Sequence, residues 1–197
     1  MLKKDLIFLG KKTEGVLSKY KTLGFENVFF IKKIKSFVEV KEKNKNKYDG
    51  YLLDTKNTEE LLKTHYKLKD KKFLFLVCGQ DEDFNRKISG TTFVTHLINP
   101  ERLTKKDHMH YRNSGFNHIT ARFCKENNIA LIIDLNELKN KIKKKKELSL
   151  QLGRIKQNIK IAEKFKLNIV VTNFPKKVSE IESFYELRDF FDSIKKD

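Results

Sequence analysis

The sequence predicts an α/β fold in which parallel strands alternate with helices as a (βα) repeat. Short apolar runs recur along the chain, and most are continuously apolar, which is typical of strands buried on both faces of a parallel sheet. Helical patterns lie between most of these runs. The first five runs begin near residues 6, 28, 51, 73 and 93, and this even repeat favours a TIM-barrel-like arrangement over a doubly wound sheet, which remains the alternative.

Seven apolar runs are the expected strands. They are Leu6–Leu9, Val28–Ile31, Tyr51–Leu53, Phe73–Val77, Phe93–Ile98, Ile129–Ile133 and Ile169–Val171. No Gly- or Ser-rich linker divides the chain, so we expect residues 1–197 to form a single domain.

Apolar residues spaced three and four apart predict helices between the strands. These helices are expected around Val16–Leu23, Leu61–Tyr66, Ile119–Phe123, Leu148–Phe165 and Ser179–Ile194. Asn57 with Glu60 resembles a capping arrangement, and Asn117 is expected to cap the helix that follows it. His108–Gly115 is expected to be a long irregular loop, whereas Lys35–Lys47 fits either a strand extension or a lysine-rich helix.

The charge balance indicates a polyanionic partner. The 43 Lys and Arg residues exceed the 26 Asp and Glu residues by 17, and such a surface gains free energy when phosphates displace condensed counterions. Of these cations 37 are Lys, which favours contact with the phosphate backbone over reading of bases, although a lysine-rich genome would give the same excess. No apolar run approaches about 20 residues and no secretory signal is present, so we expect a cytoplasmic chain without a membrane partner.

One segment concentrates the positive charge. Lys139–Lys146 places six lysines in eight positions after the sixth expected strand, and ligand loops gather at the carboxyl ends of barrel strands. A solvated loop without a ligand is the alternative for this run. The predicted RNA-binding residues are Arg112, Arg122, Lys125, Lys139, Lys141, Lys143, Lys144, Lys145, Lys146 and Arg154. Tyr111, Phe116 and Tyr185 could stack on bases, with core or loop packing as the default expectation.

A metal site is the competing interpretation of the histidines. His108 and His110 form an H-x-H motif, which in the PHP phosphoesterases follows the first strand and begins a metal cluster. Here the motif follows the fifth expected strand. Further candidate ligands at other strand ends are Asp54, His96 and Asp134, without a recognised spacing. We therefore assign no metal ligand to this chain and expect the histidines to be polar loop residues.

The sequence offers no convincing nucleophile. Cys78 and Cys124 are the only cysteines, and both are expected to pack in the core. G-x-S-x-G, Walker and G-x-G-x-x-G motifs are all missing from the sequence. We therefore assign no catalytic residue.

One stretch carries a family resemblance. Arg112-Asn-Ser-Gly-Phe-Asn-His-Ile-Thr-Ala-Arg-Phe, followed by Asn127-Asn-Ile-Ala-Leu-Ile-Ile-Asp-Leu, resembles the archaeal and eukaryotic ribonuclease P protein component 3 family, the thirty-kilodalton subunit. The positions that match the motif are Gly115, Asn117, His118, Ala121 and Ala130, and downstream Arg154, Asn158, Ala162 and Lys164-Phe-Lys. The resemblance is specific over residues 112–172. It implies structural roles for Gly115, Asn117 and His118, either in ordering the turn before a helix or at a subunit interface.

The chain also departs from that family. Thr172 is followed by Asn173-Phe-Pro where the family usually has Ser or Thr, and only Glu186-Leu187 matches a later family element. The sequence leaves no room for a further strand and helix after the last helix. The resemblance implies a PHP-like barrel, and we expect it to be reduced or distorted, with about seven strands.

The resemblance implies a function as well. The family supplies a protein subunit of ribonuclease P, an RNA-based endonuclease that removes 5′ leaders from precursor tRNA. Its RNA carries the catalytic Mg²⁺, so no cofactor is expected on this chain and the chain alone is expected to be non-catalytic. The implied partners are the ribonuclease P RNA, protein component 2 in a two-plus-two assembly, other protein subunits and precursor tRNA.

Two alternatives stay open from the sequence. One is a PHP-type metal-dependent phosphoesterase that acts alone and uses His108, His110 and a carboxylate. The other is an RNA-binding barrel of a different ribonucleoprotein.

Overall fold

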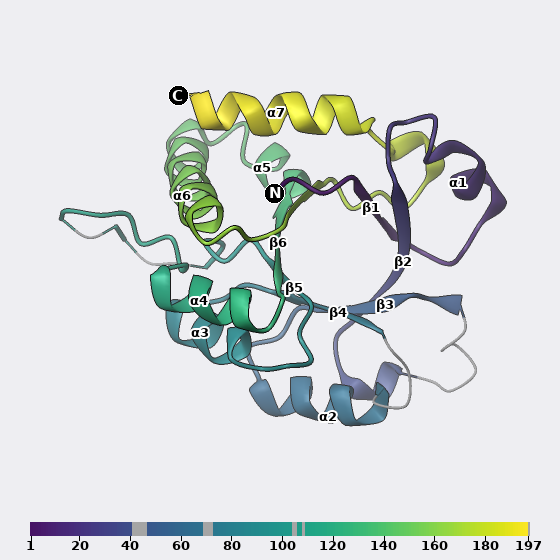
Figure 1. Cartoon of the computed structure of the whole chain (residues 1–197), viewed down its shortest axis with the longest axis horizontal. Coiled ribbons are helices and arrows are strands. Elements are labelled where there is room, and N and C mark those ends of the chain that lie inside the picture. Colours follow the sequence, from purple (N-terminus) through teal and green to yellow (C-terminus); the bar gives the residue numbers. More distant parts are fainter. Residues whose placement is uncertain (41–46, 69–72, 104–105, 108, 197) are drawn as a thin grey trace.

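The computed structural model describes residues 1–40, 47–68, 73–103, 106–107 and 109–196. The described residues form seven parallel strands that pair in chain order within one sheet (Figure 1). The strands are β1 (Asp5–Leu9), β2 (Asn27–Ile34), β3 (Gly50–Leu53), β4 (Leu74–Cys78), β5 (His96–Ile98), β6 (Ala130–Asp134) and β7 (Ile169–Thr172). All seven predicted strands are confirmed. Sequential pairing gives the barrel arrangement, because a doubly wound sheet reverses its strand order.

Helices cover the outside of this sheet (Figure 1). They are α1 (Glu14–Lys19), α2 (Thr58–Leu68), α3 (Glu82–Ser89), α4 (His118–Glu126), α5 (Leu135–Lys139), α6 (Lys145–Lys164) and α7 (Phe184–Lys196), with short 3-10 turns η1 (Phe37–Glu39) and η3 (Val178–Glu180). No helix in the described part of the chain combines the length and apolarity that crossing a bilayer would need.

The barrel is nearly closed between its first and last strands. Leu2 forms an isolated parallel bridge with Ile169, and the Lys3 amide donates to the Ile169 carbonyl oxygen at 2.7 Å. At the carboxyl end of β1, the Leu9 amide donates to the Pro175 carbonyl oxygen at 2.8 Å. A seam of backbone hydrogen bonds therefore replaces an eighth strand, which confirms the expected reduced barrel.

Two apolar clusters explain why the strands are continuously apolar. Alternate residues of all seven strands meet inside the barrel in an inner cluster: Ile7, Ile31, Leu52, Leu76, Cys78, Ile98, Ile132, Val170 and Phe174. The intervening residues, such as Leu6 and Phe8 of β1, pack with the helices in a larger outer cluster. Each strand thus buries both faces. Cys78 and Cys124 are both buried, as expected for core residues.

Some local predictions need correction. The last helix begins at Phe184 rather than Ser179, because Ser183 and Glu186 form reciprocal hydrogen bonds that start it there. Lys35–Lys47 forms neither a strand extension nor a helix where it is described: β2 ends at Ile34 and a 3-10 turn follows, while residues 41–46 lie outside the described residues. His108–Gly115 is irregular wherever it is described, as predicted, and His108 itself lies outside the described residues.

Candidate nucleic-acid interface

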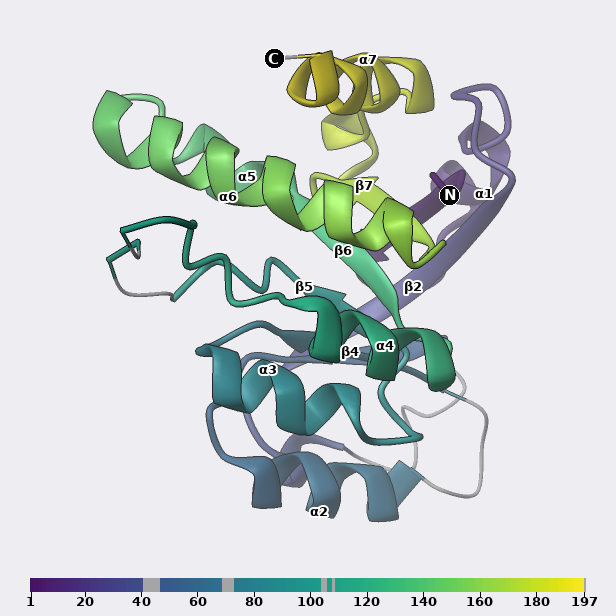
Figure 2. The same cartoon turned by 60° about the vertical axis from the view of Figure 1, so that its left-hand side comes forward.

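A long loop carries the part of the sequence with the family resemblance. Residues 99–117 connect the carboxyl end of β5 to α4, and we call them the docked loop. The loop extends away from the barrel and returns along α6 (Figure 2). Its described residues include no helix or strand, so side chains from neighbouring elements must hold its backbone.

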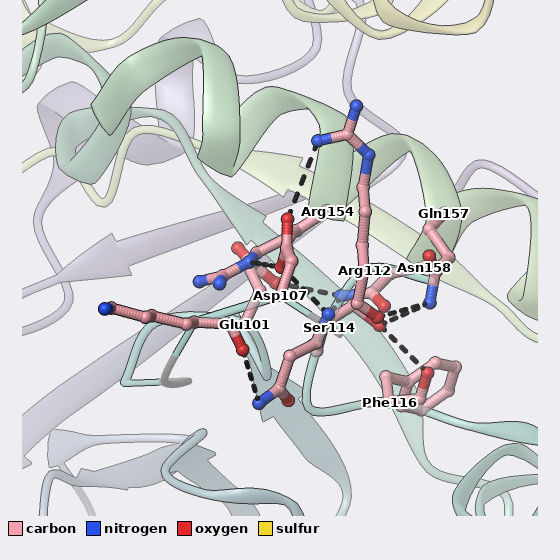
Figure 3. Close-up of polar contacts among 10 residues, drawn as sticks. Glu101, Asp107, Arg112, Ser114, Phe116, Arg154, Gln157 and Asn158 are labelled. Atoms are coloured by element: carbon pink, nitrogen blue, oxygen red, sulfur yellow. Dashed lines mark hydrogen bonds and ion pairs between the residues drawn. The ribbon is translucent and has the colours of Figure 1, made fainter. Parts of the chain in front are cut away.

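Three polar side chains on one face of α6 hold the docked loop (Figure 3). Arg154, Gln157 and Asn158 have the three- and four-residue spacing that places side chains together on a helix surface. The Arg154 side chain is only 7% exposed, and its Nε donates to Oδ1 of Asp107 at 2.8 Å. Asp107 also accepts a hydrogen bond from the Asn113 amide at 2.9 Å. This ion pair ties the outer part of the loop to the helix.

The electrostatics of Asp107 favour its charged form. Desolvation alone would raise the pKa of this carboxyl. The hydrogen bonds from Arg154 and Asn113, together with the positive charges of Arg154 and Arg112, outweigh that effect and hold the pKa below its usual value. Asp107 therefore stays ionised and keeps its bond to Arg154.

Amide side chains fasten the inner part of the loop. The Gln157 Nε2 donates to the Arg112 carbonyl oxygen at 3.2 Å and to the Ser114 Oγ at 3.1 Å. The Asn158 Nδ2 donates to the Ser114 carbonyl oxygen at 3.2 Å and to Oε2 of Glu101 at 3.0 Å. Residues far apart in the loop are thus bonded to one turn of α6.

Glu101 is buried at this junction. Burial raises the pKa of its carboxyl to about 7 despite hydrogen bonds from Gln151 and Asn158. Near neutral pH this group therefore titrates within the contact between the loop and α6.

The end of the docked loop is held by α3 and by its own turn. The Asn85 Nδ2 donates to the carbonyl oxygens of Pro100 and Gly115, both at 2.9 Å. Gly115 has a φ of 65°, a left-handed conformation that glycine adopts without strain. Asn117 caps α4 as predicted, because its Oδ1 accepts the amides of Ile119 at 2.9 Å and Thr120 at 3.0 Å.

The loop and α6 enclose a small cavity that brings several predicted residues together. Its volume is about 250 Å³, and Arg112, Gly115, Asn117 and His118 line it together with Lys164 of α6. The family-motif residues and one predicted cation therefore share a site. Arg154 lies elsewhere, buried beneath the loop, where it anchors Asp107, and its contact with RNA stays a prediction.

The other predicted cations are more dispersed. Arg122 is exposed on α4 and pairs with Glu126 at 2.8 Å, one helical turn away. The Lys125 Nζ donates to the Lys166 carbonyl oxygen at 3.5 Å, beside the residues that lead into β7. These two cations are on α4 rather than on the cavity lining, and their contact with RNA stays a prediction.

The lysine run (Lys139–Lys146) spans the end of α5, a short turn and the start of α6, beyond the carboxyl end of β6. Three of its lysines have acidic partners: Lys139 pairs with Glu182, Lys141 with Glu137 at 3.6 Å, and Lys144 with Glu147 at 3.3 Å. The exposed lysines for which no ion pair to a described residue is found are Lys143, Lys145 and Lys146. The run is therefore a partly neutralised cationic surface.

The three aromatic candidates separate clearly. Phe116 is 2% exposed and belongs to the outer core cluster, which is the default expectation for it. Tyr185 is exposed, but the Arg188 guanidinium lies 5.6 Å from its ring centroid. Tyr111 is 62% exposed and lines the cavity beside Arg112, which makes it the best-placed of the three for stacking.

The carboxyl mouth of the barrel is where an enzyme of this fold would hold its active site. Arg102 binds Asp54 there through both of its terminal nitrogens, at 3.1 and 2.6 Å, and Phe174 packs into the inner cluster below. This hydrogen bond with Arg102 lowers the pKa of Asp54 despite partial burial. A cavity of about 370 Å³ remains at the mouth, lined in part by Lys33, Arg102 and Asp134.

The candidate metal ligands have other partners. Asp54 is bound by Arg102, and Asp134 caps α5 by accepting the Asn136 amide at 2.9 Å. His96 is buried, its Nδ1 lies 2.8 Å from the Thr95 Oγ1, and desolvation lowers the pKa of its imidazole to about 4. Within the described ranges, no group of three or more His, Cys, Asp or Glu side chains is arranged to hold a metal ion.

Sequence reasoning missed the residues that hold the loop. Asp107, Gln157 and Glu101 were not expected to form the site, although polar residues at 151, 154, 157 and 158 interrupt the apolar face of the strongest helix. Buried polar residues on a helix require partners, so this pattern was an available signal. It did not identify the partners.

The chain is similar in sequence to archaeal proteins that share one name. No family model matches the chain. It is 29% identical over 162 residues to ribonuclease P protein component 3 of Methanococcus maripaludis (strain C6), which covers 82% of this chain and 66% of that protein. It is 26% identical over 147 residues to the protein of the same name from Methanocaldococcus jannaschii, covering 75% and 60% of the two chains. The chain thus spans just under two thirds of the length of these relatives.

A solved structure shares the fold. A chain in the cryo-EM structure of archaeal ribonuclease P with mature tRNA superposes with a TM-score of 0.71 and 20% sequence identity, over 95% of this chain and 82% of that chain. The nearly closed barrel therefore has a counterpart among experimentally determined structures.

Proposed function

We propose that this chain, a homologue of the archaeal proteins named ribonuclease P protein component 3, is a protein subunit of ribonuclease P, the RNA-based endonuclease that removes 5′ leaders from precursor tRNA. The observation that carries the proposal is the sequence similarity to those proteins over 82% of the chain. The similarity includes the docked loop and α6, whose contacts build the candidate interface.

In this role the chain binds RNA through its positive surface. A surplus of 17 positive charges offsets phosphate repulsion, and each phosphate that a lysine neutralises releases condensed counterions. The lysine run supplies mobile cations, and the docked loop supplies fixed ones. The partners in this proposal are the ribonuclease P RNA, protein component 2 and other protein subunits, with precursor tRNA bound in the complex.

The proposal assigns the chemistry to the RNA and its Mg²⁺ rather than to this chain. The arrangement at the barrel mouth supports it, because Arg102 is engaged by Asp54 and Phe174 fills the space beneath. A charged pair occupies the position where a barrel enzyme would present free catalytic side chains.

The phosphoesterase alternative retains one supporting observation, the cavity of about 370 Å³ at the barrel mouth. Stoichiometric Zn²⁺ or Mn²⁺ in the purified protein, with EDTA-sensitive hydrolysis of a phosphate ester, would favour it. Under our proposal the purified chain hydrolyses no phosphate ester, with or without added metal.

Reconstitution tests the subunit role directly. Ribonuclease P RNA is combined with its other protein subunits, with and without this chain, and cleavage of precursor tRNA is measured across a range of Mg²⁺ concentrations. We expect the chain to raise cleavage or to lower the Mg²⁺ requirement, because protein cations substitute for part of the counterion atmosphere. No effect in a complete assembly would instead favour an RNA-binding role in another ribonucleoprotein.

A further inference from the structure

Gly153 occupies an unexpected place in the molecule. It lies in the middle of α6, a 20-residue helix that is otherwise rich in good helix formers. Glycine is the least favourable residue after proline in a helix interior, because it loses the most backbone freedom there. Its φ is not in the left-handed region, so backbone geometry does not require glycine at this position.

A close contact accounts for the glycine. A Cβ atom at position 153 would overlap with Cζ and one terminal nitrogen of Arg112 and would lie 2.8 Å from its Nε. All three atoms belong to the guanidinium group of Arg112. This group therefore packs directly against the backbone of α6 at Gly153, in the space that a side chain at this position would fill. Figure 3 shows the Arg112 side chain extending from the docked loop across the ribbon of α6.

Two further contacts restrict Arg112, one at its backbone and one at its guanidinium. The Gln157 side chain bonds to the Arg112 carbonyl oxygen at 3.2 Å, which fixes the backbone from which the side chain extends. One terminal nitrogen of Arg112 lies 3.9 Å from Oδ2 of Asp107. That carboxylate already has its closer bond to Arg154 at 2.8 Å, so two guanidinium groups share one negative charge. The contact with Gly153 and this ion pair restrict the guanidinium, and two guanidinium groups beside one carboxylate leave an excess of positive charge.

Arg112 also stands where a ligand can reach it. Its side chain is 48% exposed. It lines the cavity of about 250 Å³ under the docked loop and a second cavity of about 310 Å³ between α6 and α7. Lys156, Ser149 and Ser193 line the second cavity, and Leu152 and Phe190 contribute apolar surface to it. Cations and hydroxyl groups around a partly apolar groove suit a phosphate with its attached ribose.

We propose that Gly153 is a positioning residue that seats Arg112 so that Arg112 and Lys156 bind one phosphodiester group of RNA in the groove between α6 and α7. A guanidinium presents parallel N–H groups to phosphate oxygens, and a group that is already ordered loses little freedom on binding. This inference rests on the proposed RNA-binding function and identifies the phosphate site within it.

The decisive variant is Gly153→Ala. The added methyl group displaces the guanidinium, which is the far end of a flexible side chain, and leaves the helix backbone in place. We expect a melting temperature equal to or above that of the wild type, because alanine is the better helix former. We expect affinity for the ribonuclease P RNA, transcribed in vitro, to fall roughly tenfold, and the slope of log affinity against log salt to decrease in magnitude by about 1.

Three further variants make the test specific. Arg112→Gln should reproduce both binding changes, and Gly153→Ala in the Arg112→Gln background should add nothing, because the two residues act on one contact. Gly15→Ala is the matched control: it adds a methyl group to another helical glycine, where the new Cβ would only reach Val178 at 3.5 Å. Its affinity for RNA should equal that of the wild type.

The outcomes separate this inference from the function on which it rests. If the wild type fails to bind the RNA in a salt-dependent manner, the proposed function and this inference both fall. If the wild type binds the RNA, and Gly153→Ala and Arg112→Gln both bind it as tightly as the wild type does, only the inference is overturned. It is also overturned if Gly153→Ala leaves RNA affinity intact and weakens association with the other protein subunits, since the groove would then hold a protein.

Discussion

The docked loop and the lysine run are both cationic, and they differ in how their charges are held. In the loop, Arg112 rests on Gly153 and shares Asp107 with the buried Arg154. In the run, six lysines crowd into eight positions, and half of them have acidic neighbours within the chain. This protein therefore presents positive charge in two forms, fixed in the docked loop and mobile in the lysine run.

The two forms suit different tasks in RNA binding. A mobile lysine gains counterion-release free energy wherever a phosphate comes near, so it contributes affinity without defining a register. A seated arginine contributes at one position and thereby orients the RNA. We therefore expect changes in the lysine run to alter affinity broadly, and changes in the docked loop to alter local structure and position.

The largest effect on stability should come from Arg154→Met. It removes the charged hydrogen bond from the buried Arg154 and leaves Asp107 with only the Asn113 amide and the more distant Arg112, so we expect a loss of about 3 kcal/mol in the free energy of unfolding. Urea denaturation followed by circular dichroism measures it, since the chain has no tryptophan. Lys160→Met, an exposed position on the same helix, is the control and should change little. A wild-type stability for Arg154→Met would show that the loop is not held by this ion pair.

The pH dependence of Glu101 should give an effect of similar size. The pKa of the Glu101 carboxyl is about 7 in the folded chain, whereas its ordinary value is 4.5. The folded state therefore binds the proton more tightly than the unfolded state does. The stability that this group contributes is fully present below about pH 4.5 and is lost as the pH rises to about 7. Glu101→Gln keeps the neutral form, so it should exceed the wild type by up to about 3 kcal/mol at pH 8.

Near pH 4.5 the wild type and Glu101→Gln should be equally stable. Measuring the difference between the two proteins at each pH removes the contributions of other titrating groups. One of these is Asp134, whose pKa is also raised, to about 6. A difference that does not vary with pH would mean that Glu101 is not desolvated at the junction. A docked loop that loosens as Glu101 ionises would sharpen the contrast with the lysine run.

The lysine run should affect binding without affecting the fold. Replacing Lys143, Lys144, Lys145 and Lys146 by Gln should lower affinity for ribonuclease P RNA by some tens of fold and reduce the magnitude of the salt slope by about 4. Stability should change by less than about 0.5 kcal/mol, because these side chains are exposed. A filter-binding titration from low to high salt measures both binding quantities.

The matched control for the lysine run replaces the same number of exposed lysines on other elements. Lys11, Lys19, Lys21 and Lys87 are exposed and lie outside the docked loop and the lysine run. Equal losses of affinity in the two quadruple variants would show that total charge alone governs binding, and the contrast between fixed and mobile charge would then have no role in affinity.

The smallest expected effect is that of Asn117→Ala. It removes the side-chain acceptor for the Ile119 and Thr120 amides at the start of α4, where the docked loop ends. Loss of an N-cap should lower the free energy of unfolding by about 1 kcal/mol. Asn117→Asp keeps the acceptor and should retain most of that stability in the same thermal or urea measurement. If Asn117→Ala were neutral, the end of the loop would be held by Asn85 and Gly115 alone.

Much of the fold could be predicted because its signals are local. The strands are continuously apolar, since each buries one face in the barrel and the other against helices. Helices α3 and α5 were harder to predict. Helix α3 has only Phe84 and Ile88 as buried apolar residues, alongside buried Asn85 and Ser89 whose partners lie in other segments. Its N-cap, Asp81, was a usable signal that apolar spacing alone did not reveal.

The candidate site was predicted in part. The family motif identified Gly115, Asn117 and His118, and Arg112 was predicted as an RNA-binding cation; the structure gathers these four around one cavity. Arg154 was predicted to contact RNA, and the structure shows that it is buried against Asp107. The sequence could not reveal this burial, because the residues around a cation do not show whether a carboxylate from another segment packs against it. Asp107, its partner, lies 47 residues earlier in the chain.

By itself, the sequence determined the strands, the excess of positive charge and the cap of α4, because each of these depends on neighbours along the chain or on composition. Only the tertiary structure decided that the Arg112 guanidinium packs against Gly153. It also decided that the docked loop is held by Arg154, Gln157 and Asn158. These contacts form when the loop packs against α6, and that packing depends on shape and distance in three dimensions, which residue spacing does not encode.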